Sequence, residues 1–383
     1  MNFFQSLDFT ADGMLSSTLF LRATNVACLV GTLLAAMSGF LHWRQVKGSS
    51  TSNPAKKLTL ATLVGANVLI GISVGKRWIE VNHFPSQTMS EVLTMFSAAL
   101  LLSMVVLHFA LNLRRIGPGW AVVDDALLAL VFLGAWATNY YSSTLSTAQR
   151  DLPPALQSYW FPPHLVALIF SYATMGIAGL VCLVYFCTRF WSGIFSGGQG
   201  RLSQVLVLLF LTILPFPHII TFPTLLLVGG IFLVLKLLGD LPSPDQLAGL
   251  EKTMDEVSYR AFAVGIPFLT GGLFMGAFWA QEAWANYWGW DSKENSALIT
   301  WLVYIVYIHL RMLGGYRGEK AMAVLMGGAL SVFMTFQIFG YLPDSQKSLH
   351  RYTDDGVVPR EGQTGVTTNN DSARLDEGTN DGR

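Results

Sequence analysis

The chain has 383 residues, of which 52% are hydrophobic and only 13% are charged, whereas a soluble globular domain carries about 25% charged residues. Its 24 Lys and Arg residues balance 24 Asp and Glu residues, so no electrostatic case for nucleic-acid binding exists. The three cysteines lie in apolar segments without a CxxC or CxxCH spacing, so they suggest neither a disulfide framework nor covalent heme attachment, and we predict buried core residues.

Long apolar runs predict transmembrane helices along most of the chain. In chain order they include residues 18–41, 88–111, 121–138, 165–187 and 321–342, which approach or exceed the roughly 20 residues that cross a bilayer. Residues 203–238 are also apolar but contain three prolines, so we expect two short spans or a re-entrant hairpin. The sequence therefore predicts an all-α, polytopic membrane helix bundle with about ten spans, or eight if residues 203–238 are re-entrant.

Basic residues follow alternate predicted spans and predict the orientation of the chain. Examples are Arg44, Lys47, Lys56, Lys57, Arg114, Arg115, Arg189, Arg201, Arg311, Arg317 and Lys320. Because such residues concentrate on the cytoplasmic side, we expect both termini and the segment WGWDSKEN to lie outside. The N-terminus lacks a basic n-region and does not suggest a cleaved signal peptide. We assign residues 1–352 to the membrane domain and predict a disordered polar tail over 353–383.

Histidines and tryptophans gather at the predicted outer side. His83, His164 and His350 fall at or just beyond the outer ends of spans, whereas His309 falls in the inner half of the bilayer. An ionisable residue at that depth indicates function. The outer segment 276–296 contains Trp279, Trp284, Trp288 and Trp290, whose broad apolar rings suit a flat apolar ligand. A pair of neutral imidazoles, such as His164 and His350, suits heme iron.

Other interpretations of these residues remain open at this point. The tryptophans are also typical of an interfacial aromatic belt, and Asp291 either positions its segment or contacts heme propionates. A b-type electron carrier would need His108 to face His309, although His108 more simply bonds to a neighbouring helix. A transporter of another amphipathic ligand would use the aromatic outer segment and broken helices near Pro215 to Pro223. We expect Asp124 and Asp125 to cap a helix, and His42 to lie at an interface.

The run GAFWAQEAWANYWGWDSKENSALITWLVYIVYIHLR, residues 276–311, resembles the tryptophan-rich signature of the CcsA (ResC) family of system II cytochrome c biogenesis. Shorter matches follow in the family's order: RW...HFP...E from Arg77, PALQSYW...H...SY from Pro154, and SYR from Ser258. The segment WDSKEN departs from the family's usual WDPKET, and the surroundings of His350 also differ. The residues WDSKEN are more similar to the corresponding segment of the CcmF-type proteins of system I, which are the alternative family.

The resemblance to the CcsA family implies a specific function and site. It implies a protein that binds heme b non-covalently, as cargo, and promotes its attachment to CxxCH of apocytochrome c together with a CcsB (ResB)-type membrane subunit. Such a chain is a subunit of a cytochrome c heme lyase complex, in a bacterial cytoplasmic or thylakoid membrane with its heme site on the periplasmic or lumenal side. The residues implied in heme binding are His164, His350, His309, Trp279, Trp284, Trp288, Trp290, Asp291 and His83.

Overall fold

A computed structural model describes residues 16–48, 52–110, 120–145, 152–196, 205 and 218–337. Its elements are α1 (Ser17–Val46), α2 (Pro54–Val81), α3 (Met89–Val105), the π-helix η2 (Val106–Ala110), α4 (Trp120–Thr144), the 3₁₀ helix η4 (Pro154–Gln157), α5 (Phe161–Ser196), α7 (His218–Leu237), α8 (Pro244–Trp284), α9 (Ser292–Met312) and α10 (Glu319–Gln337). The described residues contain no strand, which confirms the predicted all-α class.

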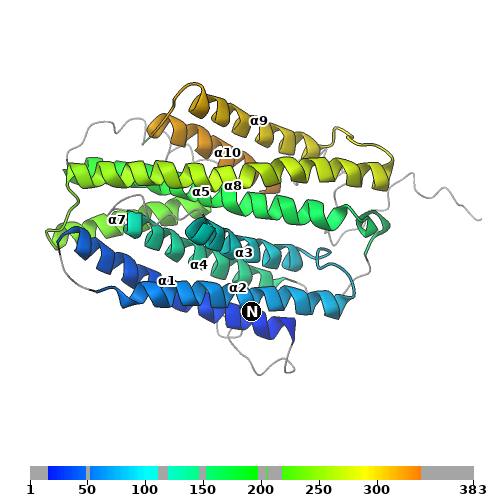
Figure 1. Cartoon of the computed structure of the whole chain (residues 1–383), viewed down its shortest axis with the longest axis horizontal. Coiled ribbons are helices and arrows are strands. Elements are labelled where there is room, and N and C mark those ends of the chain that lie inside the picture. The colour runs from blue at the N-terminus through cyan, green and yellow to red at the C-terminus, as the bar shows by residue number, and fades with distance from the viewer. Residues whose placement is uncertain are drawn as a thin grey trace, which may run out of the picture.

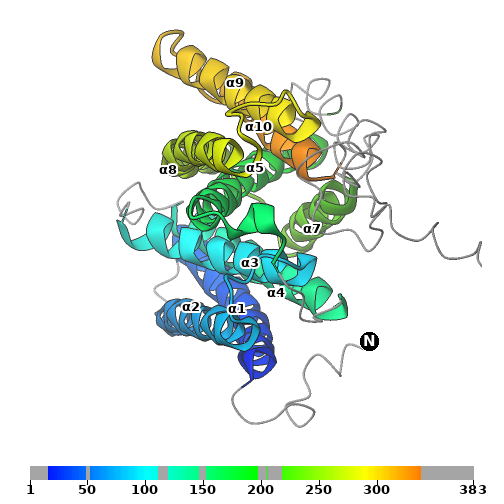
Figure 2. The ribbon, with the colours of Figure 1, turned by 90° about the vertical axis from the view of Figure 1, so that its right-hand side faces the viewer.

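The long helices run alongside one another, with α1 and α2 on one side of the molecule and α9 and α10 on the other (Figure 1). Turned by 90°, the structure shows α5 and α8 between these two pairs (Figure 2). We call the end of the bundle with Ser17, Phe161 and Trp284 the tryptophan end. The opposite end, with Val46 and Glu319, is the basic end.

Helix starts coincide with capping residues in the sequence. Asn53 caps α2 with Pro54 in its first turn, and Ser243 caps α8 with Pro244 in the same place. Thr88 and Glu91 form a capping box at α3, with each side chain bonded to the other residue's backbone. These caps satisfy amide groups that the first helical turn leaves unpaired.

Six described helices are long and apolar enough to cross a membrane. They are residues 17–46, 54–81, 89–109, 120–144, 161–195 and 244–284. The structure therefore supports a polytopic membrane protein, while the count of about ten spans and the location of the termini stay predictions. Cys28, Cys182 and Cys187 are free and buried, as the sequence predicts.

The apolar block at residues 203–238 is described only in part. Its later half forms α7, which packs on α5 through Trp191, whose indole N–H donates to the carbonyl of Leu225 at 2.9 Å. Near the following turn, Lys47 donates to the carbonyl of Leu241, so α7 ends at the basic end. Arg189 near the end of α5 pairs with Glu251 of α8 at the same end. The chain thus leaves α5 and enters α8 at the same end of the bundle, the basic end. This agrees with the expectation that residues 203–238 cross the membrane an even number of times or not at all.

Candidate functional site at the tryptophan end

His164 lies in the first turn of α5 and faces α8. Its Nδ1–H donates to the carbonyl of Gly272 at 2.8 Å, and its ring stacks on Trp279 with 5.5 Å between ring centroids and 29° between planes. A neutral imidazole that donates through Nδ1 carries its lone pair on Nε2. Metal-binding histidines commonly have this arrangement, in which a carbonyl fixes the tautomer and the ring orientation.

Two glycines of α8 make this close approach possible, and the sequence argument did not assign them a role. A Cβ atom built on Gly276 would lie 2.6 Å from Cε1 of His164, and one on Gly272 would lie 2.6 Å from Leu168. Gly272 also supplies the carbonyl that receives the imidazole N–H. Gly272 and Gly276 have the i, i+4 spacing of small residues that is typical of closely packed membrane helices. This spacing is the feature of the sequence from which their role could have been predicted.

Trp279 is 2% exposed, and its ring packs against the imidazole of His164. Its indole N–H donates to the carbonyl of Ala155 in η4 at 2.7 Å, and its ring contacts Phe161 and Trp284 at centroid distances of 5.0 and 4.9 Å. This residue therefore ties η4 and the start of α5 to the end of α8. Of the four predicted tryptophans, Trp279 supports the site from within rather than offering an open surface.

The segment after α8 presents the other aromatic rings. Ala285 and Trp290 bracket it, each in the left-handed backbone region with φ of 56°, where residues other than glycine are uncommon. Trp290 is 70% exposed and lies edge-to-face with Trp288 at 6.2 Å. The indole nitrogen of Trp288 is buried and has no hydrogen-bond partner among the described residues. A strained segment with an exposed ring and an unpaired donor is typical of a binding site.

Asp291 begins α9 and organises the charged run. Its side chain accepts from the amide of Lys293 at 2.6 Å, while Glu294 accepts from the amides of Gly289 and Asp291 at 2.8 and 3.2 Å. Asp291 and Glu294 also form a capping box, in which each side chain bonds to the backbone of the other residue. Asn295 further donates to the carbonyl of Trp290 at 2.9 Å. Of the two predicted roles of Asp291, the described contacts support positioning of the segment.

His83 lies in the connection between α2 and α3, at the same end of the bundle. Its Nδ1–H donates to the carbonyl of Phe84 at 2.9 Å. Phe84 packs against a cluster that includes Ile169 of α5, so this connection lies beside the helix that carries His164.

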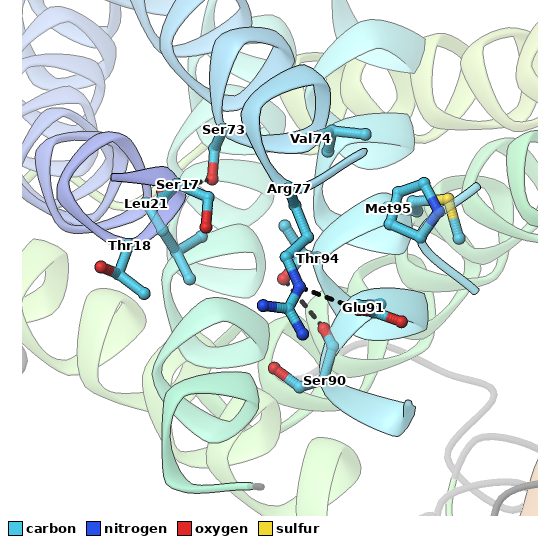
Figure 3. A pocket seen from close by; sticks show the side chains of 11 residues that line it. Ser17, Thr18, Leu21, Ser73, Val74, Arg77, Ser90, Glu91, Thr94 and Met95 are labelled. Atoms are coloured by element: carbon cyan, nitrogen blue, oxygen red, sulfur yellow. Dashed lines mark hydrogen bonds and ion pairs between the residues drawn. The ribbon is translucent and has the colours of Figure 1, made fainter. Parts of the chain in front are cut away.

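An ion pair holds the connection that carries His83. Arg77 Nε donates to Glu91 at 2.8 Å, next to a small cavity lined by residues of α1, α2 and α3 (Figure 3). Glu91 also accepts from the amides of Gln87 and Thr88, both at 3.0 Å. The motif RW...HFP...E therefore has a structural basis, because its Arg and Glu residues clamp the segment between α2 and α3.

His309 lies near the basic end of α9 and is separate from the tryptophan segment. Its side chain is exposed on the outside of the bundle, and Nδ1–H donates to the carbonyl of Ile305 at 2.8 Å. His108 instead pairs with Asp124 at 3.0 Å and is buried. The pair of His108 and His309 required for a b-type electron carrier is therefore contradicted.

The sequence-based expectation for Asp124 and Asp125 at the basic end is wrong. Asp124 and Asp125 do not cap a helix; both are buried inside the bundle, where Lys56 contacts both carboxylates. His42, near the end of α1, also contacts Asp125. Buried carboxylates need such cationic partners because an unpaired charge in this environment is costly. The cluster joins α1, α2 and α4.

His350 lies outside the described residues, so its predicted pairing with His164 stays a prediction. Within the described part of the chain, no group of three or more His, Cys, Asp or Glu side chains is arranged to hold a metal ion. The tryptophan end offers an oriented imidazole and aromatic rings. Fold and site together define a helical membrane protein with an aromatic, histidine-containing site at one end.

Comparison with known proteins identifies the family. Residues 29–343 match the family model described as cytochrome C assembly protein. CcsA proteins for cytochrome c biogenesis match over most of their length. That of Trieres chinensis is 29% identical over 84% of this chain and 94% of its own. The CcsA protein of Guillardia theta is 31% identical over 75% of this chain and 82% of its own. The CcsA protein of Microcystis aeruginosa is 29% identical over 75% of this chain and 84% of its own. The chain belongs to the CcsA family of integral membrane proteins for cytochrome c biogenesis.

Proposed function

We propose that this chain binds heme b non-covalently at the tryptophan end and presents it to apocytochrome c, with His164 as an axial ligand. The observation that carries the proposal is the orientation of His164. Its Nδ1–H is engaged by the Gly272 carbonyl at 2.8 Å and its ring stacks on Trp279, an arrangement that fixes the tautomer and the ring orientation as in metal-binding histidines.

The tryptophan segment supports a porphyrin rather than a small ion. Trp290 exposes most of its ring, and Trp284 and Trp288 extend the aromatic surface. The unpaired indole N–H of Trp288 suits a carboxylate such as a heme propionate. In the proposal Asp291 acts by holding this segment through the cap of α9, and His350 supplies the second axial ligand.

Two further histidines take supporting roles in the proposal. His309 contributes a second heme contact within the membrane; its exposure on α9, where a polar group facing lipid is costly, supports a ligand or partner there. His83 lies in a clamped connection beside α5, which supports a role at the edge of the outer site.

The chemistry of attachment follows from what heme supplies when bound: its vinyl groups accept the two cysteine thiols of a CxxCH peptide. The chain's own part is to hold and orient, because positioning alone lowers the barrier of such a reaction substantially. We propose that a CcsB (ResB)-type subunit completes a heme lyase complex. The tryptophan end then faces the periplasm or the lumen, an orientation that the basic residues at the other end support.

The test is a covalent heme-attachment assay in a host that lacks its own CcsA protein. Wild type expressed with the CcsB-type subunit should restore heme-stained c-type cytochromes on denaturing gels, whereas His164→Ala should lose most of this signal because the iron loses an axial ligand. Val166→Ala, an exposed position two residues away, should behave as wild type. Normal heme attachment by His164→Ala, at equal protein level, would refute the proposed role of His164.

A further inference from the structure

Three buried polar atoms on one side of α9 have no hydrogen-bond partner among the described residues. They are the hydroxyl oxygens of Tyr304 and Tyr307 and the Nε atom of Arg311. These residues are 0%, 1% and 3% exposed. Their i, i+3, i+7 spacing places them on one helix face, roughly opposite the exposed His309. The site is therefore distinct from both proposed heme contacts.

Helices α8 and α10 contact this face of α9, and α5 packs on both of them. Phe262 of α8 contacts the rings of Tyr304 and Tyr307 at centroid distances of 5.4 and 4.8 Å. The ring of Tyr304 lies against Gly328 of α10, where an added Cβ would come within 2.3 Å. Cys182 of α5 lies against Met322 of α10, with 3.7 Å between the two sulfur atoms. The rings of Tyr304 and Tyr307 therefore share Phe262 as a neighbour and are enclosed within the bundle.

At the basic end of α9, Arg311 forms an ion pair with Asp255 of α8. Arg311 Nη1 and Nη2 donate to the two carboxylate oxygens of Asp255 at 2.8 and 3.2 Å. The guanidinium charge is thereby compensated, although the Nε–H still lacks an acceptor. Because the pair is neutral overall, the surroundings do not favour an anion, and because the tyrosines and Arg311 present donors, they do not favour a metal ion.

Hydrogen-bonding groups in the interior of a membrane protein need partners, since lipid provides none. The peptide carbonyls of the surrounding helices are committed to their own helical bonds. A ligand for this site must be small, neutral and able both to accept and to donate. Water meets these requirements, and buried water characteristically bonds to polar groups that lack protein partners.

We propose that Tyr304, Tyr307 and Arg311 hold a file of buried water molecules that extends from the Arg311–Asp255 pair into the middle of the membrane. Seven residues separate Arg311 from Tyr304, a rise of about 10 Å along α9. The file gives protons at the basic end a hydrogen-bonded route to the centre of the bundle. It requires no heme and so stands or falls separately from the proposed function.

Radiolytic hydroxyl-radical labelling of the full-length chain in lipid nanodiscs tests this directly, because radicals formed from bound water modify buried side chains next to it. We expect labelling of Tyr304 and Tyr307 well above that of Phe132, which is equally buried among apolar groups in α4. Tyrosine labelling no greater than that of Phe132 would show a dry interior and overturn the proposal.

Conservative substitution gives a second, independent result. If water bonds the hydroxyls, Tyr304→Phe and Tyr307→Phe each remove a satisfied bond and lower Tm. In a dry interior, the same changes remove an unpaired polar group and leave Tm equal or higher. An unchanged or raised Tm in both variants would therefore contradict the water file. The labelling experiment uses wild type alone, so it remains decisive even if a Tyr→Phe variant fails to fold.

Discussion

At the scale of single residues, the orientation of His164 depends on the absence of a side chain at Gly276. A Cβ there would lie 2.6 Å from Cε1 of the imidazole and 2.8 Å from Nδ1. We predict that Gly276→Ala displaces the ring, lowers heme content in the purified complex and costs about 1–3 kcal/mol of stability through overpacking. Absorption spectra and thermal unfolding measure the two effects.

Gly271, on the same helix, provides the control for this prediction. Nothing lies within 4 Å of a Cβ built at that position, so Gly271→Ala should retain both heme and stability. If both alanine variants bind heme as wild type does, the close contact between α5 and α8 is not what orients His164.

A substitution at Trp290 can distinguish the effect of backbone strain on stability from the effect of the indole ring on heme binding. Its φ of 56° is unfavourable for tryptophan and comfortable for glycine. We predict that Trp290→Gly relieves about 1 kcal/mol of backbone strain while losing heme affinity, because the exposed ring is removed. Heme titration and thermal unfolding of the same sample should move in opposite directions. Heme affinity equal to that of wild type would remove Trp290 from the site.

At the scale of secondary-structure elements, the cap of α9 distinguishes two roles for Asp291. Asn is as good an N-cap as Asp, whereas Ala is not. If Asp291 acts by positioning, Asp291→Asn retains heme and stability, and Asp291→Ala loses both, with about 0.5–2 kcal/mol of stability. Heme loss in Asp291→Asn with unchanged unfolding would instead indicate that the carboxylate charge contacts the ligand.

Which features were predictable depends on how local their causes are. The helices and the grouping of Trp284, Trp288 and Trp290 follow from neighbouring residues in the sequence. The partners of Asp125 do not, because His42 and Lys56 lie 83 and 69 positions away and meet it only when α1, α2 and α4 pack. The buried position of Trp279 likewise required knowledge of η4, whose Ala155 carbonyl receives its N–H.

At the scale of the whole molecule, the proposed orientation in the membrane can be tested with the native cysteines in place, because all three are buried. Tyr159 at the tryptophan end is 82% exposed, and Ser52 at the basic end is also exposed. We predict that a membrane-impermeant maleimide labels Tyr159→Cys in intact cells and labels Ser52→Cys only after permeabilisation. The reverse pattern would invert the topology.

The central claim is that heme is held at the tryptophan end by His164. The measurement that tests it most directly is the visible absorption spectrum of the chain purified with its CcsB-type subunit, comparing wild type, His164→Ala and Val166→Ala. We predict low-spin reduced heme bands in wild type and Val166→Ala. We also predict that the bands weaken in His164→Ala and return when imidazole is added. Bands of equal intensity in all three proteins without imidazole, or no heme in any of them, would contradict it.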